Sequence, residues 1–460
     1  MNVLTGDQYR QSLADGRRVF FQGQEVDVLE HEIFQRSIRS VARTYDKYFN
    51  PEDGAISEYF RAPRSVEEMT AHAEHKVDVV TSNTYGSLMT LLTSADRIEA
   101  IRPEASAAMR GYVAYVQRED LRIAECITDA KGDRSKSASA QEDPDAYLRV
   151  VEQRPDGVVI RGAKLHISGA ALSHELLVIP TKRMKEGEEA YSIACTVPVN
   201  AEGVKIVNVT SEPQGDANFL DAPISANAHT AMGFVIFDNV FVPGDRVFLN
   251  GEYQAAATFA HALGLWVRMN GLKNMADEAD ALVGFAQLIA EANGLQRAPN
   301  IRDRITEMIM HATIVRACLD AALSKSTVSA EGVVVPDELY ANAGKYQGAA
   351  FRALMVSYIQ DIAGGSLVTV PSSLDLENPE VGHEIRKYMS TMQSVDGKYR
   401  TSLFHALRDV VASGHAGQKQ VATLQGGGGL TAQRIVTRGR YDLEKAKRQA
   451  LELAGLDAPT

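Results

Sequence analysis

The stretch RGAKLHISGAALSHELLVIPT, residues 161–181, is a β-prone run that a lysine, a histidine and several small polar residues interrupt. It continues through a serine and histidine turn into four apolar residues, 176–179. Around it, from 147 to 250, short alternating or apolar runs are separated by Pro, Gly, Asn and Asp, which is the pattern of short strands joined by turns. The sequence therefore predicts a compact, barrel-like β-domain in the middle of the chain.

The segments on either side of this β-domain have the apolar spacing of helices. Residues 30–125 and those beyond 255 repeat apolar positions three and four apart, as amphipathic helices do. The polar loop DAKGDRSKSASAQEDPD begins at residue 129 and marks the first boundary. We expect an α+β chain with an N-terminal helical domain (1–140), a middle β-domain (141–255) and a C-terminal helical bundle (256–460).

Composition and charge narrow the function classes. The 460 residues carry a net charge of −11, whereas nucleic-acid-binding chains usually cluster Lys and Arg, so nucleic acid is not an expected partner. Cys126, Cys195 and Cys318 lie far apart and form no zinc or redox spacing, so no metal is expected. The first 18 residues contain no apolar core of the length found in signal peptides, and no run of about 18 apolar residues occurs in the sequence. We expect a cytoplasmic protein that does not insert into a membrane.

Two groups of glycines leave alternatives open. No strand is followed by the GxGxxG pattern of NAD-binding domains. The glycine run 426–429 either lets the backbone approach a phosphate at a helix start or forms a flexible turn. The pair Gly364 and Gly365 either ends a helix or takes part in binding.

The strand that contains His166 and Ser168 could face a ligand. The two residues lie two apart, on one face of a strand, where an imidazole and a hydroxyl could hydrogen-bond a heteroaromatic ring such as flavin. The alternative is a partly buried histidine that the backbone satisfies.

Two further stretches carry polar residues with alternative interpretations. Thr128, Asp133 and Arg134 belong to a loop that could grip a ring edge or a pyrophosphate, or could be a solvated linker. Trp266 is typical of a core residue, and the nearby Arg268 and Lys273 are typical of surface cations.

Taken in order, several stretches are specific enough to indicate a family: VIRGAKLHISGA, ACTVPVNAEGVKIV, VIFDNVFVPGDRVF, QDIAGGSLVTVPSS and GGGGLTAQRI. The chain resembles, over nearly its whole length, the 4-hydroxyphenylacetate 3-monooxygenase and 4-hydroxybutyryl-CoA dehydratase family of flavoproteins. This resemblance implies an acyl-CoA-dehydrogenase-like fold, a homotetramer formed through the C-terminal bundle, and FAD held between the β-domain and the bundle. The cofactor contacts that it implies are Cys126, Thr128, Asp133, Arg134, His166, Ser168, Lys273, the segment 332–336 with Val335, Asp361, Gly364 and Gly365.

At several positions this chain differs from the family's known site residues, and these differences limit the reactions that we expect. The dehydratase branch holds an iron–sulfur cluster with three cysteines and a histidine, because cluster irons need thiolate ligands. Here the helix VVTSNTYGSLMTLL (79–92) has no cysteine, and Leu272 stands where another would be needed. The phenol-hydroxylase branch handles its phenol with an arginine, a tyrosine and a histidine, at positions that correspond to Thr90, Ser94 and Glu125. We therefore expect a cluster-free member that keeps the cofactor frame and has lost both substrate-handling sets.

The resemblance implies an FAD-dependent oxidoreductase, a two-component monooxygenase that hydroxylates an aromatic or enolic small molecule. A separate reductase would supply FADH2, because the chain has no NAD-binding motif. The candidates for substrate handling are His166 as donor or base, Glu125 as a replacement acid or base, and Arg268 or Lys273 for an anionic group. Two alternatives stay open: a cluster-free flavin-dependent dehydratase, isomerase or dehydrogenase acting on an acyl-CoA or specialised metabolite, and a non-catalytic scaffold.

Overall fold

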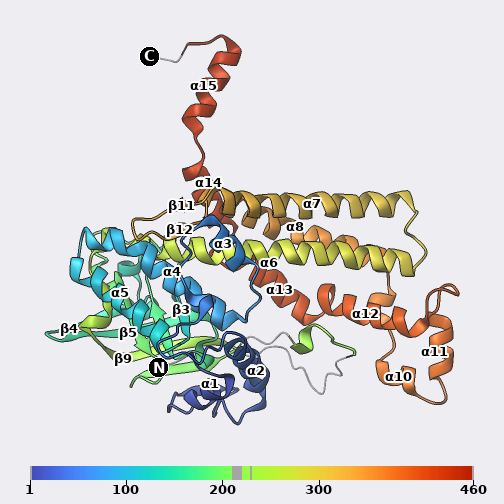
Figure 1. The fold of residues 1–460 in the computed structure, drawn as a ribbon, viewed down its shortest axis with the longest axis horizontal. Helices are drawn as coiled ribbons and strands as arrows, with labels where there is room; N and C mark the ends of the chain where they lie inside the picture. The colour runs from blue at the N-terminus through green and yellow to red at the C-terminus, as the bar shows by residue number, and fades with distance from the viewer. Residues whose placement is uncertain (1–2, 210–219, 228–230, 458–460) are drawn as a thin grey trace. The chain divides into compact units, whose positions relative to one another are not determined.

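The computed structural model describes residues 3–209, 220–227 and 231–457, which form two compact units (Figure 1). Unit 1 comprises Met1–Val267, Thr327–Val335 and Gly364–Gly417. Unit 2 comprises Arg268–Ser326, Pro336–Ala363 and Gln418–Thr460.

Unit 1 is built on two β-sheets. Among the described residues, one sheet has six strands in the order β2-β1-β8-β9-β5-β4, and the other has four in the order β10-β7-β6-β3. The strands are β1 (Val19–Phe21), β2 (Gln24–Glu25), β3 (Ile123–Cys126), β4 (Arg149–Arg154), β5 (Gly157–Ser168), β6 (Glu175–Val178), β7 (Ile193–Pro198), β8 (Val204–Asn208), β9 (Met232–Pro243) and β10 (Val247–Asn250). Each β-prone run expected between 147 and 250 forms a strand, so the predicted strands are confirmed. The segment before residue 140 adds β1, β2 and β3 to the sheets.

The long antiparallel pair of β5 and β9 contains a β-bulge. Lys164 pairs with Val235 and Ile167 with Gly233, so the register shifts between these two pairs. The bulged residue His166 has a φ of +63°, in the left-handed region that non-glycine residues seldom adopt. A bulge re-aims side chains and often marks a functional edge of a sheet.

Two apolar cores flank the four-stranded sheet. Its strands alternate, as pleated strands do: Ala124 and Cys126 of β3 pack into a core shared with the six-stranded sheet. Ile123 of β3 and Leu177 of β6 pack on the opposite side, against helices. The next residue of β3 on that helical side is Glu125.

Unit 1 also contains helices (Figure 1). They are α1 (Gly6–Ser12), α2 (Glu32–Lys47), α3 (Val66–Ala73), α4 (Val79–Glu99), α5 (Pro103–Arg118), α9 (Ser366–Thr369), α10 (Ser373–Glu377), α11 (Gly382–Met389) and α12 (Gly397–Val411). Helix α4 begins at the N-cap Asp78, whose carboxylate accepts hydrogen bonds from the Val80 and Thr81 N–H groups, as N-cap residues do. The helical spacing expected from residue 30 to 125 is confirmed by α4 and α5. Its last part is wrong, because residues 123–126 pair with β6 and form strand β3.

Unit 2 consists mainly of helices. They are α6 (Ala256–Ala292), which begins in unit 1, α7 (Pro299–Ser324), α8 (Glu338–Ala363), α13 (Gly414–Gln425), which ends in unit 2, α14 (Gly429–Arg440) and α15 (Leu443–Ala454). Within the unit, α6, α7 and α8 run side by side (Figure 1). Gly344 of α8 lets these helices approach closely, because a Cβ atom there would lie 2.8 Å from Leu272 and 2.5 Å from Cys318.

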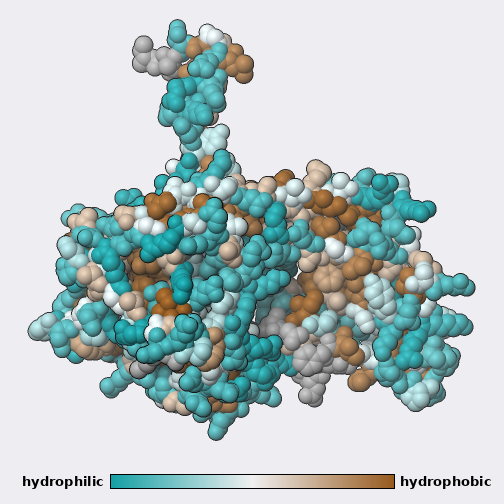
Figure 2. Space-filling view, in the orientation of Figure 1, coloured by the Kyte–Doolittle hydropathy of each residue, from teal (hydrophilic) through white to brown (hydrophobic). Residues whose placement is uncertain are grey.

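The last helix, α15, buries none of its side chains in the described structure. Asp442 caps its start by accepting a hydrogen bond from the Lys445 N–H, and Gly455, with a φ of +64°, ends it. Figure 2 shows hydrophobic surface near its end, where Leu453 and Leu456 are 92% and 63% exposed. Among the described residues, no helix is long and apolar enough to cross a membrane.

Candidate functional site

Three of the predicted cofactor contacts lie at or beside the bulge in β5; we call Thr128, His166 and Ser168 the bulge site. The Leu165 N–H donates to the Thr128 carbonyl at 2.7 Å, which places the loop after β3 next to His166. His166 is exposed and Ser168 is half-buried, so the interpretation of His166 as a buried histidine is wrong. Within the described residues, the Thr128 hydroxyl, the His166 ring and the Ser168 hydroxyl have no hydrogen-bond partner.

A buried ion pair positions the loop that carries Thr128. Lys164 Nζ lies 2.8 Å from Asp129 Oδ1, and both side chains are 2% exposed. Lys164 also donates to the Ile127 and Ile179 carbonyls at 3.0 and 2.9 Å, and Asp129 accepts from the Leu148 N–H at 2.9 Å. A buried pair is tolerated when its remaining hydrogen bonds are satisfied in this way. This pair therefore fixes Thr128 against the strand that carries His166.

The remaining predicted contacts of this loop are placed differently. Cys126 is fully buried in the core between the sheets, and burial raises the pKa of its thiol. Only its backbone is therefore available to a ligand. Asp133 and Arg134 are exposed, and Asp133 accepts from the Ser135 N–H and hydroxyl at 2.9 and 2.7 Å, which closes a local turn.

Glu125 presents a carboxyl group on the helical side of β3. Its Oε1 atom is enclosed and, in the described part of the chain, accepts no hydrogen bond. Burial raises the pKa of this carboxyl to about 8. Gly86 of α4 makes room for it, because a Cβ atom there would lie 2.7 Å from Glu125 Oε1. A carboxyl with such a pKa can hold or release a proton near neutral pH.

The same face of α4 carries the two other positions that the resemblance relates to phenol handling. Gly86, Thr90 and Ser94 are spaced four apart and so line one helix face. The Thr90 hydroxyl donates to the Gly86 carbonyl at 2.7 Å. The Ser94 hydroxyl is buried and has no partner among the described residues. The Glu125 carboxyl thus meets α4 at Gly86, and Thr90 and Ser94 lie one and two turns farther along that helix.

An aromatic cluster beside α4 was missed by the sequence analysis. Tyr85 stacks on His72 with 3.8 Å between ring centroids and meets Trp266 edge to face at 5.9 Å. The Tyr59 carbonyl lies 3.1 Å from His72 Nε2. Burial lowers the pKa of His72 to about 4, so this ring is neutral at physiological pH. The buried Tyr85 hydroxyl has no partner within the described residues. These aromatic residues lie far apart in the sequence, which therefore gave no local signal.

The other predicted residues fall in both units. In unit 1, Val335 is half-buried in a hairpin, and Gly364 and Gly365 are exposed. Gly364 directly follows α8 and has a φ of +71°, as is typical of a glycine that ends a helix. In unit 2, Asp361 pairs with Arg304.

The two cations near Trp266 differ from each other. Lys273 forms an ion pair with Asp277, with 3.3 Å between Nζ and Oδ2. Arg268 is buried, so the expectation of a surface cation is wrong for this residue. Trp266 itself lies in the core of unit 1, as expected.

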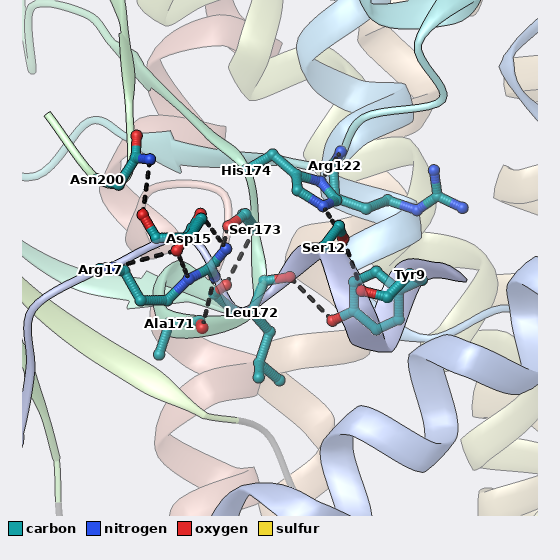
Figure 3. Close-up of polar contacts among 11 residues, drawn as sticks. Tyr9, Ser12, Asp15, Arg17, Arg122, Ala171, Leu172, Ser173, His174 and Asn200 are labelled. Atoms are coloured by element: carbon teal, nitrogen blue, oxygen red, sulfur yellow. Dashed lines mark hydrogen bonds and ion pairs between the residues drawn. The ribbon is translucent and has the colours of Figure 1, made fainter. Parts of the chain in front are cut away.

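A serine and a histidine meet elsewhere in unit 1 (Figure 3). Ser12 Oγ lies 2.8 Å from His174 Nε2. His174 Nδ1 accepts the Arg122 N–H at 2.9 Å, so in the neutral ring Nε2 carries the proton and donates to Ser12. Burial lowers the pKa of His174 well below its ordinary value. His174 therefore cannot take the Ser12 proton. The pair instead connects α1 to the residues that directly precede β6 and β3.

No group of three or more His, Cys, Asp or Glu side chains among the described residues is placed to bind a metal ion. Cys126 and Cys195 are buried in the core between the sheets, and Cys318 lies on α7. These positions offer no set of three thiolates.

Comparisons with known proteins cover almost the full chain. Residues 5–249 match the family model "4-hydroxyphenylacetate 3-hydroxylase N terminal", and residues 256–455 match "4-hydroxyphenylacetate 3-hydroxylase C terminal". The chain is 27% identical to 4-hydroxybutyryl-CoA dehydratase/vinylacetyl-CoA-Delta-isomerase of Clostridium aminobutyricum, over 99% of this chain and 100% of the relative. It is 25% identical to the oxygenase component of 4-hydroxyphenylacetate 3-monooxygenase of Thermus thermophilus, over 91% of this chain and 90% of the relative. A solved oxygenase component of 4-hydroxyphenylacetate 3-monooxygenase, complexed with FAD, has a TM-score of 0.85 at 23% identity, over 98% of each chain.

Proposed function

The chain belongs to the 4-hydroxyphenylacetate 3-hydroxylase family, and from this premise we propose that it is an FAD-dependent, two-component monooxygenase that hydroxylates an aromatic or enolic small molecule. The predicted acyl-CoA-dehydrogenase-like fold is confirmed by its likeness to solved members. The observation that carries the proposal is the bulge site together with the nearby acid Glu125 in one unit.

The bulge site fits FAD. It offers two hydroxyls and an imidazole, none of which has a protein partner among the described residues, and flavin presents donors and acceptors along one edge of its ring. Thr128 and His166 are held side by side by the Asp129 and Lys164 pair, so little ordering is needed on binding. Bound as FADH2, the cofactor supplies the electrons that activate molecular oxygen.

Glu125 is the candidate general acid and base for such a hydroxylation. Because its pKa is about 8, the carboxyl is mainly protonated at neutral pH and can donate a hydrogen bond to a phenol or enol oxygen. In its ionised form it can accept the proton of that oxygen. Thr90, Ser94 and Glu125 stand where the phenol-hydroxylase branch has an arginine, a tyrosine and a histidine. We therefore propose a substrate different from 4-hydroxyphenylacetate.

The residues do not fit the iron–sulfur cluster of the dehydratase branch. Leu272 replaces one required cysteine, and the three cysteines lie in a buried core and on α7. Thiolate ligands are essential for such clusters. A cluster-free dehydratase, isomerase or dehydrogenase is the second candidate, because the 27% identity to the Clostridium aminobutyricum enzyme covers the full chain.

A separate flavin reductase and a homotetramer complete the proposal. The Thermus thermophilus relative is an oxygenase component, which is the part of a two-component system that receives reduced flavin. The exposed apolar residues of α15 support burial against further copies of the chain, because a large exposed apolar surface usually marks an interface.

Oxygen consumption with chemically reduced FAD tests the proposed reaction. The chain is mixed with FADH2 and a set of phenols and enols under air labelled with oxygen-18. We expect one labelled oxygen atom in the product, with oxygen uptake coupled to the substrate. Label-free conversion of an acyl-CoA would instead favour the cluster-free dehydratase or isomerase.

Two controls separate binding from chemistry. Flavin fluorescence during titration reports FAD binding, and a failure of the chain to bind FAD would leave only the scaffold alternative. Glu125→Gln keeps the shape of the side chain and removes its proton transfer. This variant should bind FAD like the wild type and lose about 100-fold or more in product formation.

A further inference from the structure

Helix α4 contacts both parts of the proposed site in unit 1. Gly169 directly follows β5 and has a φ of +72°, and a Cβ atom there would lie 2.5 Å from Val80 Cγ2. Farther along α4, a Cβ atom at Gly86 would lie 2.7 Å from Glu125 Oε1. Because an α-helix rises 1.5 Å per residue, these two contacts are only about 9 Å apart along its axis. Helix α4 therefore fixes the end of β5, which carries Ser168, relative to the acid.

Asn83 lies on α4 midway between these two contacts. It is three residues from Val80 and three from Gly86, so the three residues are neighbours on the helix surface. The Asn83 side chain is half-buried. Its Nδ2 atom donates to the Ser168 carbonyl at 3.4 Å, which is long for a hydrogen bond of this kind. Asn83 thus lies beside the bulge site and one turn from the position where Glu125 meets α4.

Most of the hydrogen-bonding capacity of the Asn83 amide is unused. An asparagine amide has two N–H donors and an oxygen that can accept two hydrogen bonds. The bond to Ser168 uses one N–H. Within the part of the chain that the structure describes, the second N–H and Oδ1 have no partner. Because the side chain is only half-buried, a ligand that enters from solvent can reach both groups.

The threonines on either side of Asn83 have hydroxyls that are already bonded within the protein. The Thr81 hydroxyl donates to Asp78 Oδ2 at 2.8 Å. The Thr84 hydroxyl donates to the Val80 carbonyl at 2.8 Å and accepts the Ile123 N–H at the same distance. These hydroxyls hold the start of α4 and its contact with β3. The Asn83 amide, in contrast, keeps a donor and an acceptor for a ligand.

We propose that Asn83 binds a second oxygen atom of the substrate, so that the substrate is a ring with two oxygen substituents, such as a dihydric phenol or a hydroxylated enone. The inference rests on the proposed function, in which Glu125 holds the first phenol or enol oxygen. Asn83 Oδ1 accepts from a second hydroxyl, or the free N–H donates to a second carbonyl oxygen. A substrate without this oxygen leaves the amide unpaired, which is how such a group discriminates between substrates.

Calorimetric titration of the full chain, with oxidised FAD in excess, tests the role of Asn83. The probes are phenol, catechol and resorcinol, and without a reductant none of them is turned over. The wild type should bind catechol or resorcinol about fivefold to tenfold more tightly than phenol, because one hydrogen bond is added. Asn83→Leu removes the amide and keeps a side chain of similar length. It should bind phenol as the wild type does and lose the preference for the second oxygen.

Asn250→Leu is the matched control. Asn250 is another half-buried asparagine of unit 1, and its amide exchanges two hydrogen bonds of 2.9 Å with the Gln153 amide. This variant should keep the wild-type preference for catechol or resorcinol. If Asn83→Leu does not fold, Asn83→Ala replaces it and should lose the same preference.

Flavin fluorescence during titration separates a substrate contact from a cofactor contact. Asn83→Leu should bind FAD as the wild type does, because Thr128, His166 and Ser168 are unchanged. Three results would overturn the proposal: no preference in the wild type, an unchanged preference in the Asn83 variants, or a loss of FAD affinity that accompanies the loss of preference.

The oxygen-18 experiment tests the proposed hydroxylation separately, because binding to the oxidised form requires no turnover. A preference for two oxygen substituents that depends on Asn83, without labelled product, would contradict the hydroxylation and support the role of Asn83. Labelled product without that preference would support the hydroxylation and contradict the role of Asn83.

Discussion

Glu125 is half-buried and, among the described residues, has no ionic partner, because the strand alternation of β3 turns it toward α4 and encloses its Oε1 atom. The neighbouring Cys126 points into the core between the sheets. On the α4 side, Gly86 leaves the space that the carboxyl occupies. The polar group of the candidate site therefore depends on one glycine of a different element.

Glu125 should make the stability of unit 1 depend on pH. Burial raises its pKa from 4.5 to about 8, so between these values the folded chain holds a proton that the unfolded chain has released. The free energy of unfolding therefore falls as pH rises from about 4.5 to about 8. Glu125→Gln should have little effect at pH 5 and should stabilise the chain by on the order of 3 kcal/mol at pH 9.

Denaturant unfolding followed by the fluorescence of Trp266 measures this effect, because Trp266 is the single tryptophan of the chain and is buried in unit 1. An equal change at pH 5 and pH 9 would contradict the raised pKa.

Gly86 and Gly111 form a matched pair for substitution. Both lie inside helices of unit 1, but a Cβ atom at Gly86 would meet Glu125, and one at Gly111 would meet nothing within 4 Å. Gly86→Ala should destabilise the chain by about 1–3 kcal/mol through overpacking. Gly111→Ala should stabilise it by about 0.5–1 kcal/mol through helix propensity. Trp266 fluorescence during denaturation measures both, and a stabilising Gly86→Ala would show that the carboxyl is free to move away.

Among the elements of unit 1, β5 holds the start of the loop that follows β3. Lys164 of β5 forms an ion pair with Asp129 and donates to two carbonyl groups. These bonds hold the loop against the bulge. The bulge site, Thr128, His166 and Ser168, forms because the ion pair of Lys164 and Asp129 holds the loop next to the bulge in β5.

Lys164→Met should loosen this connection. It leaves Asp129 buried without its cation, which should cost about 3–5 kcal/mol, and it should weaken FAD binding because Thr128 loses its fixed position. Lys205→Met is the control: Lys205 lies on β8 and pairs with Asp238 at 3.1 Å, and both side chains are much more exposed. The control should change stability by less than about 1 kcal/mol. Equal losses in the two variants would show that the buried pair does not support the site.

Helix α15 should contribute to assembly and not to the stability of a single copy. It buries none of its side chains in the described structure. A chain that ends at Tyr441 should keep its unfolding midpoint at concentrations where it is monomeric and should lose the proposed tetramer at higher concentrations. Sedimentation velocity measures the mass of both forms. A tetramer that persists after truncation would place the interface elsewhere.

At the scale of the whole molecule, the chain divides into a sheet-based unit and a helical unit. We expect these units to unfold separately, since chains of several domains commonly deviate from two-state behaviour. The midpoint from Trp266 fluorescence, which reports unit 1, should differ from the midpoint of the helical circular dichroism signal, to which both units contribute. Coincident curves would mean that the two units form one cooperative structure.

Local patterns of apolar spacing and of turn residues were enough to predict the strands between 147 and 250, helices such as α4 and α5, and the family. The sequence also placed Thr128, His166, Ser168 and Glu125 among the candidates. Only the tertiary structure decided which of them share a site. The bulge in β5, the Lys164 and Asp129 pair, the space at Gly86 and the burial of Arg268 arise from contacts between residues far apart in the chain. Burial and pairing are properties of those contacts, and they set the charge and the pKa that give a residue its chemistry.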